Sequence, residues 1–184
     1  TAITLTGAQS GSFYGTAGCG AGTVTAATVS SGQSTATFYY KNNTAQTVTL
    51  ASDTGGYSQS TQAVTVNPAA PSVLALAGVT PVTAGACSAT AYTVTTKDAL
   101  GNVSTVGGNT SVTLSGAQAG SFYGTAGCGA GTVTAATVTT GQSTATFYYK
   151  NNTAQTVTLA TDTGSYAQGP LGVVVNPTTP TVLA

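Results

Sequence analysis

Charge is what this sequence lacks most. Its 184 residues include three basic and three acidic side chains and no His, so charged residues make up 3% of the chain. Proteins usually have about 25%. Without a basic cluster, the chain lacks the electrostatic surface by which proteins bind nucleic acid. Its solubility must come from hydroxyl and amide groups, and little charge keeps copies of the chain apart.

Long apolar runs and helical patterns are also missing. No apolar stretch reaches the ~20 residues that span a bilayer, so we expect no direct membrane insertion. No window places apolar residues at helical spacing over three turns. Thr, Val and Tyr favour strands, and Gly-rich turns separate them. The sequence has no signal peptide and no initiating Met, so we expect it to be the interior of a processed, exported polypeptide.

An internal repeat organises what is present. The segment 11–29 recurs unchanged as 120–138, and the segment 32–51 recurs as 141–160. Both copies have the same offset of 109 positions. Self-similarity at a fixed spacing is typical of repeat architectures, so we expect further copies outside this chain.

The repeat predicts three parts. Residues 1–70 form an incomplete repeat that lacks its N-terminal strands, residues 71–179 form a complete repeat, and residues 180–184 begin a further one. The missing strands are either covalently upstream or supplied by another chain. Upstream is the simpler source, because the complete repeat has no spare copy to donate. Proline should make the joint at 67–71 a semi-rigid spacer.

Within the complete repeat, short segments alternate between apolar and polar residues. About seven such segments in about 100 residues predict an antiparallel β-sandwich, in which one face of each sheet is buried. Ala145, Phe147 and Tyr149 should share the inner face of one strand. The predicted strands are 72–76, 91–97, 111–114, 132–138, 143–150, 156–161 and 171–175.

Two motifs in the complete repeat resemble motifs of a known domain family. The run YTVTTKDALGN at 92–102 resembles the strand-and-turn motif of bacterial Ig-like repeats of the invasin/intimin type (group 1). The run GQSTATFYYK at 141–150, which leads to TVTLA at 156–160, resembles the paired strands near the end of that domain. The resemblance implies an all-β fold of tandem immunoglobulin-like antiparallel β-sandwiches. It also implies a bacterial cell-surface location and a role as stalk or spacer in large adhesins, with no catalytic residues.

The cysteines predict a crosslink. Two Cys per complete repeat suit an oxidising, extracellular setting, and we expect a disulfide between Cys87 and Cys128. Cys19, which is equivalent to Cys128, should then pair with a residue outside the chain. A catalytic thiol is the competing hypothesis, but no His or Arg is present to activate it. Two Cys without His cannot complete a tetrahedral zinc site.

No other residues form a pattern that predicts catalysis or metal binding. A paired-carboxylate hydrolase needs two carboxylates at a fixed separation in a cleft. The complete repeat offers only Asp98, which already fits a turn, and Asp162. We therefore expect no catalytic residue, no cofactor and no metal site. Asn-X-Ser/Thr sequons mark candidate glycosylation sites at Asn42, Asn102, Asn109 and Asn151.

The sequence leaves two candidate functions. The first is a structural repeat of an extracellular filament or adhesin stalk, non-catalytic and rod-forming, whose partners are copies of itself in tandem and laterally in a fibre. The alternative is an Ig-like adhesion module that binds surface glycans or a protein. Identical loops in both copies favour the structural hypothesis, because ligand-binding loops are expected to vary between copies.

Overall fold

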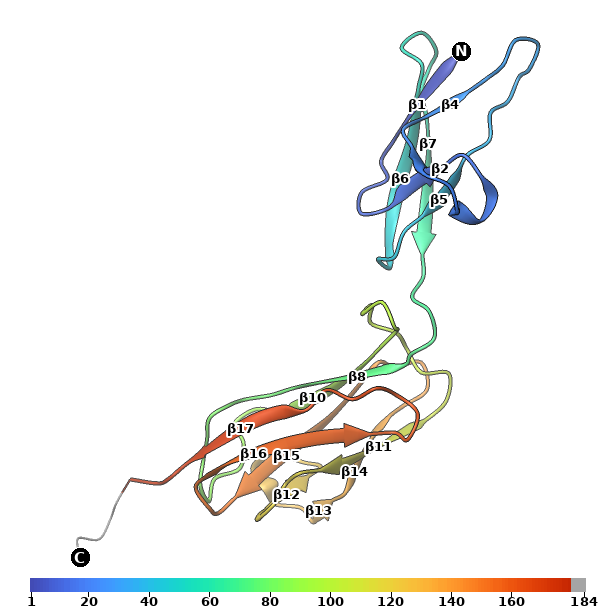
Figure 1. The fold of residues 1–184 in the computed structure, drawn as a ribbon. Coiled ribbons are helices and arrows are strands. Elements are labelled where there is room, and N and C mark those ends of the chain that lie inside the picture. Colours follow the sequence, from blue (N-terminus) through green and yellow to red (C-terminus); the bar gives the residue numbers. More distant parts are fainter. Residues whose placement is uncertain (180–184) are drawn as a thin grey trace, which may run out of the picture. The chain divides into compact units, whose positions relative to one another are not determined.

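The computed structural model describes residues 1–179, which divide into two compact units (Figure 1). Unit 1 is Thr1–Pro68, and unit 2 begins at Ala69. The repeat spacing places the boundary after residue 70, close to this division. The further repeat expected at 180–184 lies outside the described residues.

Strands and loops make up both units. Among residues 1–179, the only helical segments are two short 3₁₀ turns, Ala17–Cys19 and Ala126–Cys128. In the described part of the chain, no helix is long and apolar enough to cross a bilayer.

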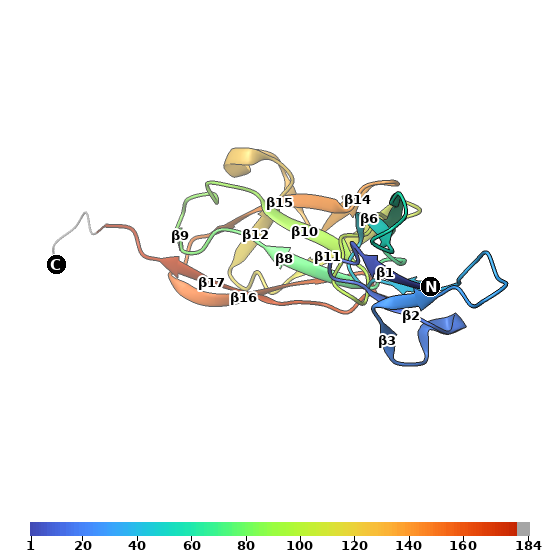
Figure 2. The same cartoon turned by 90° about the horizontal axis from the view of Figure 1, so that it is seen from above.

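Unit 2 contains two five-stranded sheets. The first has, in spatial order, β13 (Thr132–Val133), β12 (Gly120–Tyr123), β15 (Thr144–Asn151), β10 (Tyr92–Lys97) and β8 (Val73–Ala77). The second has β14 (Ala135–Val138), β11 (Thr110–Ser115), β16 (Gln155–Asp162), β17 (Leu171–Asn176) and β9 (Val82–Thr83). Figures 1 and 2 show β16 and β17 side by side in the second sheet.

The strand order is that of an immunoglobulin-like sandwich. In that fold strands A, B, E and D form one sheet and strands C, F and G the other. Here β8, β10, β15 and β12 correspond to the first set, and β11, β16 and β17 to the second. Neighbouring strands are antiparallel except β9 and β17, which pair in parallel. The predicted all-β sandwich is therefore confirmed.

An aromatic cluster occupies the core between the sheets. Tyr92 on β10 stacks on Phe147 with ring centroids 5.4 Å apart and meets Tyr149 edge-on at 6.3 Å. Phe122 meets Phe147 edge-on at 5.3 Å. The Tyr92 hydroxyl donates to the carbonyl of Val79 at 2.7 Å, so the buried ring leaves no polar atom unpaired. Such aromatic pairs add about 1 kcal/mol each beyond the burial of their area.

The structure corrects the strand prediction in two places. The single strand expected at 132–138 is two strands in different sheets, because β13 pairs with β12 and β14 pairs with β11. The chain crosses between sheets at Thr134, whose carbonyl accepts from the N–H of Leu114. The strands β9 and β12 were not predicted, since they are too short for alternation to mark them.

Unit 1 repeats the second half of this sandwich. Its sheets have the orders β4-β1-β6-β7 and β3-β2-β5, which match β14-β11-β16-β17 and β13-β12-β15 of unit 2. Its described residues include no counterpart of β8, β9 or β10. The strands are β1 (Ala2–Thr6), β2 (Ser12–Tyr14), β3 (Thr23–Val24), β4 (Ala26–Thr28), β5 (Tyr39–Lys41), β6 (Gln46–Asp53) and β7 (Ser60–Val66).

The buried Tyr92 makes unit 2 sensitive to alkali. Burial, and secondly the proximity of Tyr149, raises the pKa of Tyr92 from 10.0 to about 12. The fold therefore favours the protonated phenol, and this stability is complete below pH 10.0 and lost as pH rises toward 12. We expect the free energy of unfolding of unit 2, measured by urea titration, to fall over that pH interval.

Tyr92→Phe should flatten this pH dependence. At neutral pH the substitution should cost about 1 kcal/mol, because the hydrogen bond to Val79 is lost. Tyr57→Phe is the matched control, since Tyr57 is 75% exposed. An unchanged alkaline profile in Tyr92→Phe would contradict the assignment.

Candidate functional site

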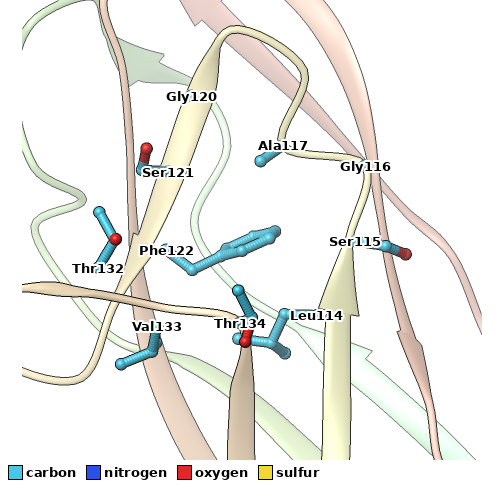
Figure 3. A pocket seen from close by; sticks show the side chains of 10 residues that line it. All are labelled: Leu114, Ser115, Gly116, Ala117, Gly120, Ser121, Phe122, Thr132, Val133 and Thr134. Carbon is cyan, nitrogen blue, oxygen red and sulfur yellow. The ribbon is translucent and has the colours of Figure 1, made fainter.

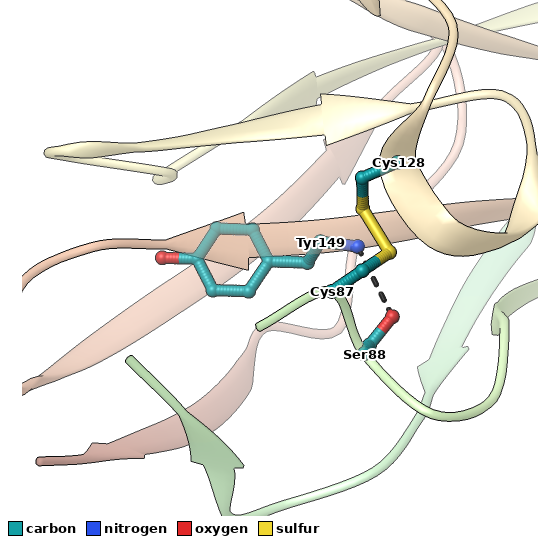
Figure 4. The surroundings of a disulfide bond; sticks show 4 residues. All are labelled: Cys87, Ser88, Cys128 and Tyr149. Carbon is teal, nitrogen blue, oxygen red and sulfur yellow. Dashed lines mark hydrogen bonds between the residues drawn. A yellow bond between two sulfur atoms is a disulfide. The ribbon is translucent and has the colours of Figure 1, made fainter. Parts of the chain in front are cut away.

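A disulfide joins Cys87 to Cys128 in unit 2 (Figure 4). Their Cα atoms are 5.6 Å apart, and 41 positions separate them in sequence. Cys87 bridges to Lys150 on β15, and Cys128 ends the 3₁₀ turn after β12. The bond links the loop that leads into β10 to the loop that follows β12, and it is the pair that the sequence predicts.

Hydrogen bonds reinforce the covalent link. Ser88 donates its N–H to the carbonyl of Tyr149 at 2.9 Å, and its Oγ accepts from the Tyr149 N–H at 3.2 Å. Figure 4 shows this second bond beside the disulfide. The segment before β10 is thus held to β15 by both backbone and sulfur, which is the arrangement of a structural crosslink.

Unit 1 has the same turn without the crosslink. Cys19 and Cys128 both have a φ of 54°, and the preceding Gly18 and Gly127 have φ of 75° and 76°. Cys19 is half-buried, and its thiol is free in the described chain. The local sequence therefore forms this turn whether or not a disulfide follows. That Cys19 pairs with a residue outside the chain stays a prediction.

Asp98 is the most buried charged group in unit 2, with 1% of its surface exposed. Its Oδ1 accepts from the N–H groups of Leu100 and Asn102, each at 2.9 Å. Its Oδ2 accepts from the side-chain amide of Asn102 at 2.9 Å and from the N–H of Ala69 at 3.0 Å. These bonds, that from the Asn102 side chain foremost, lower the pKa of Asp98 although burial alone would raise it.

The linker residue Ala69 is held on both of its backbone groups. Its N–H donates to Asp98, and its carbonyl accepts from the Oγ of Ser104 at 2.6 Å. Both partners are buried, Ser104 with 4% exposed. The linker is therefore anchored to unit 2 from the first residue of that unit.

The other two carboxylates, both half-buried, cap turns. Asp162 accepts from the N–H of Gly164 at 2.6 Å, and Asp53 accepts from Gly55 at 2.7 Å in the equivalent turn of unit 1. Asp98 and Asp162, the two candidates for a paired-carboxylate site, are each bonded within their own turns. Within residues 1–179, no three or more His, Cys, Asp or Glu side chains gather as metal ligands.

Sequence reasoning missed a side-chain relay that occurs in both units. Asn151 donates from Nδ2 to the Tyr149 hydroxyl at 2.8 Å, and that hydroxyl donates to the carbonyl of Ala117 at 3.0 Å. Burial raises the pKa of Tyr149. The same relay in unit 1 consists of Asn42, Tyr40 and Ala8, with distances of 2.8 and 2.9 Å. An Asn two residues after a core Tyr, on the same strand face, was the available signal.

The relay corrects one predicted glycosylation site. Asn151 is 1% exposed and its Nδ2 is bonded inside the domain, so a glycan cannot be attached there without unfolding. Asn42 and Asn102 are half-exposed, and each donates its Nδ2 to a neighbouring side chain. Asn109 is exposed and accepts from Thr140 through Oδ1, so it is the best placed of the four for a glycan.

An open pocket recurs at one place in both units. In unit 2 it has a volume of about 290 Å³ and lies where β11 and β12 diverge into different sheets; its copy in unit 1 has about 280 Å³. Figure 3 shows Phe122 pointing from β12 across the pocket toward β11. None of the lining residues is ionisable. Phe122 is 5% exposed, so it offers little aromatic surface for a ligand.

Glycines shape this pocket. Gly116 has a φ of +80°, and a Cβ there would overlap the carbonyl oxygen of Thr158. A Cβ on Gly120 would lie 2.7 Å from both the Lys150 carbonyl oxygen and the Tyr149 ring. These positions let the chain after β11 approach β16 closely and let β12 approach β15 closely.

Comparison with known proteins yields no family. No family model and no curated protein matches the sequence. Similar solved structures include the D00-D0 domain of intimin, with a TM-score of 0.48 and 14% identity, covering 94% of this chain and 83% of that one. Domains 4-9 of surface layer protein SbsC have a TM-score of 0.41 and 18% identity, covering 80% of this chain and 20% of that one. A beta-glycosidase from Bacteroides vulgatus has a TM-score of 0.48 and 10% identity, covering 95% of this chain and 21% of that one.

The chain thus spans about a fifth of the glycosidase and of the SbsC fragment. At these scores the likenesses carry no argument about activity. What the strand order and the crosslink define is a class: a disulfide-containing immunoglobulin-like sandwich, present here once with all its strands and once without the leading ones.

Removing the disulfide should destabilise unit 2. A closed loop of this length contributes about 4 kcal/mol in the chain-entropy view, so Cys87→Ser with Cys128→Ser should lower the free energy of unfolding by about that amount. Denaturant titration measures it. Cys19→Ser is the matched control and should leave unit 2 unchanged, because Cys19 belongs to the other unit. A loss below ~1 kcal/mol would show that the hydrogen bonds of Ser88 suffice.

Proposed function

We propose that this chain is a non-catalytic structural repeat of an extracellular filament or adhesin stalk on a bacterial surface. Its partners are copies of the same repeat, joined in tandem and packed laterally. The disulfide supports an extracellular location, because such bonds persist in oxidising compartments. The engagement of Asp98 and Asp162 in turns supports a role without catalysis.

The path of the chain through unit 2 carries this proposal. The chain arrives at β8, where Val73 bridges in parallel to Ala167, just before β17. It leaves after Asn176, at the opposite end of β17, where Asn176 pairs with Thr83. At a strand rise of ~3.3 Å per residue, these two points lie about 30 Å apart along the sandwich. A domain entered at one end and left at the other extends a chain of repeats lengthwise.

The anchored linker supports stiffness. Ala69 is bonded at both its N–H and its carbonyl, so the free part of the joint is shortened on the unit 2 side. Pro68 and Pro71 flank this region, and each fixes its own φ. A short, restrained joint resists bending better than a Gly/Ser linker.

A chain of several complete repeats should scatter X-rays as a stiff rod. We expect a maximum dimension that grows by about 40 Å per added repeat, from strand rise and sandwich size. A compact globule of the same mass would contradict the proposal.

Asp98→Ala should loosen the joint in such an array. The substitution removes the carboxylate that accepts from the Ala69 N–H, so the persistence length of the rod should fall at neutral pH. Asp162→Ala is the matched control, because it removes one turn hydrogen bond without touching the linker. Equal stiffness in both variants would show that Ala69 is not the restraint.

Low pH should also loosen the joint between repeats. Because the folded pKa of Asp98 lies below its ordinary value of 3.8, its stabilisation is present above that pH and is lost as pH falls through the lowered folded value. Scattering of wild type across this acid range, with Asp98→Asn alongside, measures the effect. The Asp98→Asn variant should lose this pH dependence, because its amide does not titrate.

The pocket present in both units favours a second candidate, an adhesion module that binds glycans. Its polar lining consists of Ser and Thr hydroxyls, which suit neutral sugars. Binding of neutral oligosaccharides, measured by calorimetry and abolished by Thr134→Val, would establish this alternative.

A further inference from the structure

Unit 1 presents an open strand edge in a segment that is paired in unit 2. Residues 35–38 have the sequence TATF, identical to 144–147. In unit 2 these four residues belong to β15 and pair with β10, in the register Tyr92↔Phe147 through Thr95↔Thr144. In unit 1 the same four residues are not in a strand, and β5 begins only at Tyr39.

The side chains along this edge are less buried than their copies. Ala36, Phe38 and Tyr40 are only partly buried in unit 1. Their equivalents are almost fully buried: Ala145 at 7%, Phe147 at 1% and Tyr149 at 0% exposed. Phe38 also lines a cavity of about 390 Å³ between this edge and β6 and β7, together with Leu50 and Gln62.

In unit 2, two strands cover the equivalent surface. Tyr92 and Val94 on β10 are fully buried over Phe147 and its neighbours. Leu74 on β8 is 1% exposed, and its N–H donates to the Ala167 carbonyl at 2.7 Å. Unit 2 therefore displays the occupant that fits this surface, with its register and contacts.

The loop that carries Tyr57 in unit 1 is less buried than its copy in unit 2. In unit 2, β8 holds the loop at 163–168 through bonds to Ala167, and Tyr166 packs against the core. In unit 1 the equivalent Tyr57 is 75% exposed. The residues before both tyrosines are bonded alike through Asp53 and Asp162.

We propose that the open face of unit 1, defined by residues 35–42 and the cavity beside Phe38, is an acceptor for the leading strands of the repeat, which unit 1 lacks. The occupant has the chemistry of residues 71–97 and comes from the stretch of the same polypeptide that the repeat spacing places directly before Thr1. This source rests on the tandem array proposed above. A second chain is the less suitable donor, because its own 71–97 segment is bound within its unit 2.

The docked register follows from unit 2. The residue equivalent to Tyr92 lies opposite Phe38, and that equivalent to Val94 lies opposite Ala36. The residue equivalent to Cys87 then meets Cys19, whose turn already has the backbone conformation of bonded Cys128. Docking is completed by oxidation of the two thiols to a disulfide, with two protons and two electrons passing to an added oxidant such as oxidised glutathione.

The direct test places a copy of residues 71–109 before Thr1 in the full chain. After refolding with oxidised and reduced glutathione, we expect Cys19 to resist alkylation under denaturing, non-reducing conditions. Peptide mapping should find it bonded to the Cys of the added segment. Unit 1 should also gain protection from hydrogen exchange at 35–38. A Cys19 that is still fully alkylated, with no protection at 35–38, would overturn the proposal.

Two variants separate docking from thiol chemistry. In the first, the added copy carries Cys87→Ser; protection at 35–38 should persist without the bond. In the second, it carries Tyr92→Ser and Val94→Ser but retains its Cys; protection and selective pairing with Cys19 should both be lost. Equal disulfide yield in the second variant would show that the face does not select its occupant.

The source is tested with Cys19→Ser in the chain without the added copy. We expect this variant to be monomeric, and a free peptide of residues 71–97 to protect 35–38 when added in excess. Dimers in which 35–38 are protected would instead assign the donor to a second chain and overturn the proposed source. Rod-like scattering of complete repeats is independent of these outcomes, so failure here does not count against the proposed function.

Discussion

Backbone pairing between β10 and β15 brings Tyr92 over Phe147 and Tyr149, and most of the other features of unit 2 depend on that placement. The segment just before β10 also runs along β15, where Cys87 bridges to Lys150. This places Cys87 beside the turn that carries Cys128. The turn just after β10 contains Asp98, which binds the linker at Ala69. One strand thus connects the aromatic core, the covalent crosslink and the restraint on the joint.

The scarcity of charge explains why these interactions matter so much. Small domains have a net stability of about 5–15 kcal/mol, and here almost none of it can come from ion pairs. Apolar burial, hydrogen bonds and a crosslink must supply it. The one deeply buried carboxylate, Asp98, is tolerated because four donors satisfy it. A surface of hydroxyls and amides also lets copies of the chain approach without repulsion, which suits a repeat that meets its own copies.

Much of the complete repeat was predictable from the sequence. The strand β15 shows clear alternation, and its inner face of Ala145, Phe147 and Tyr149, predicted from that alternation, is buried. The split at Thr134 was not predictable, because the side-chain pattern runs through it while the backbone partner changes from β12 to β11. The cysteine pair was inferred from count and setting. The burial of Asn151 was not, because a sequon records residue type and says nothing of the hydrogen bond that Tyr149 accepts.

The two copies separate what local sequence determines from what tertiary structure decides. The turn at Cys19 and Cys128 has the same dihedral angles in both units, with or without a disulfide, because its glycines and short-range hydrogen bonds specify it. The four residues TATF are a strand at 144–147 and are not one at 35–38, although the sequences are identical. A strand exists only where a neighbour accepts and donates its hydrogen bonds. Sequence alone therefore determined the turns, the alternation and the supply of thiols, and the presence of β10 decided whether they became a closed, crosslinked sandwich.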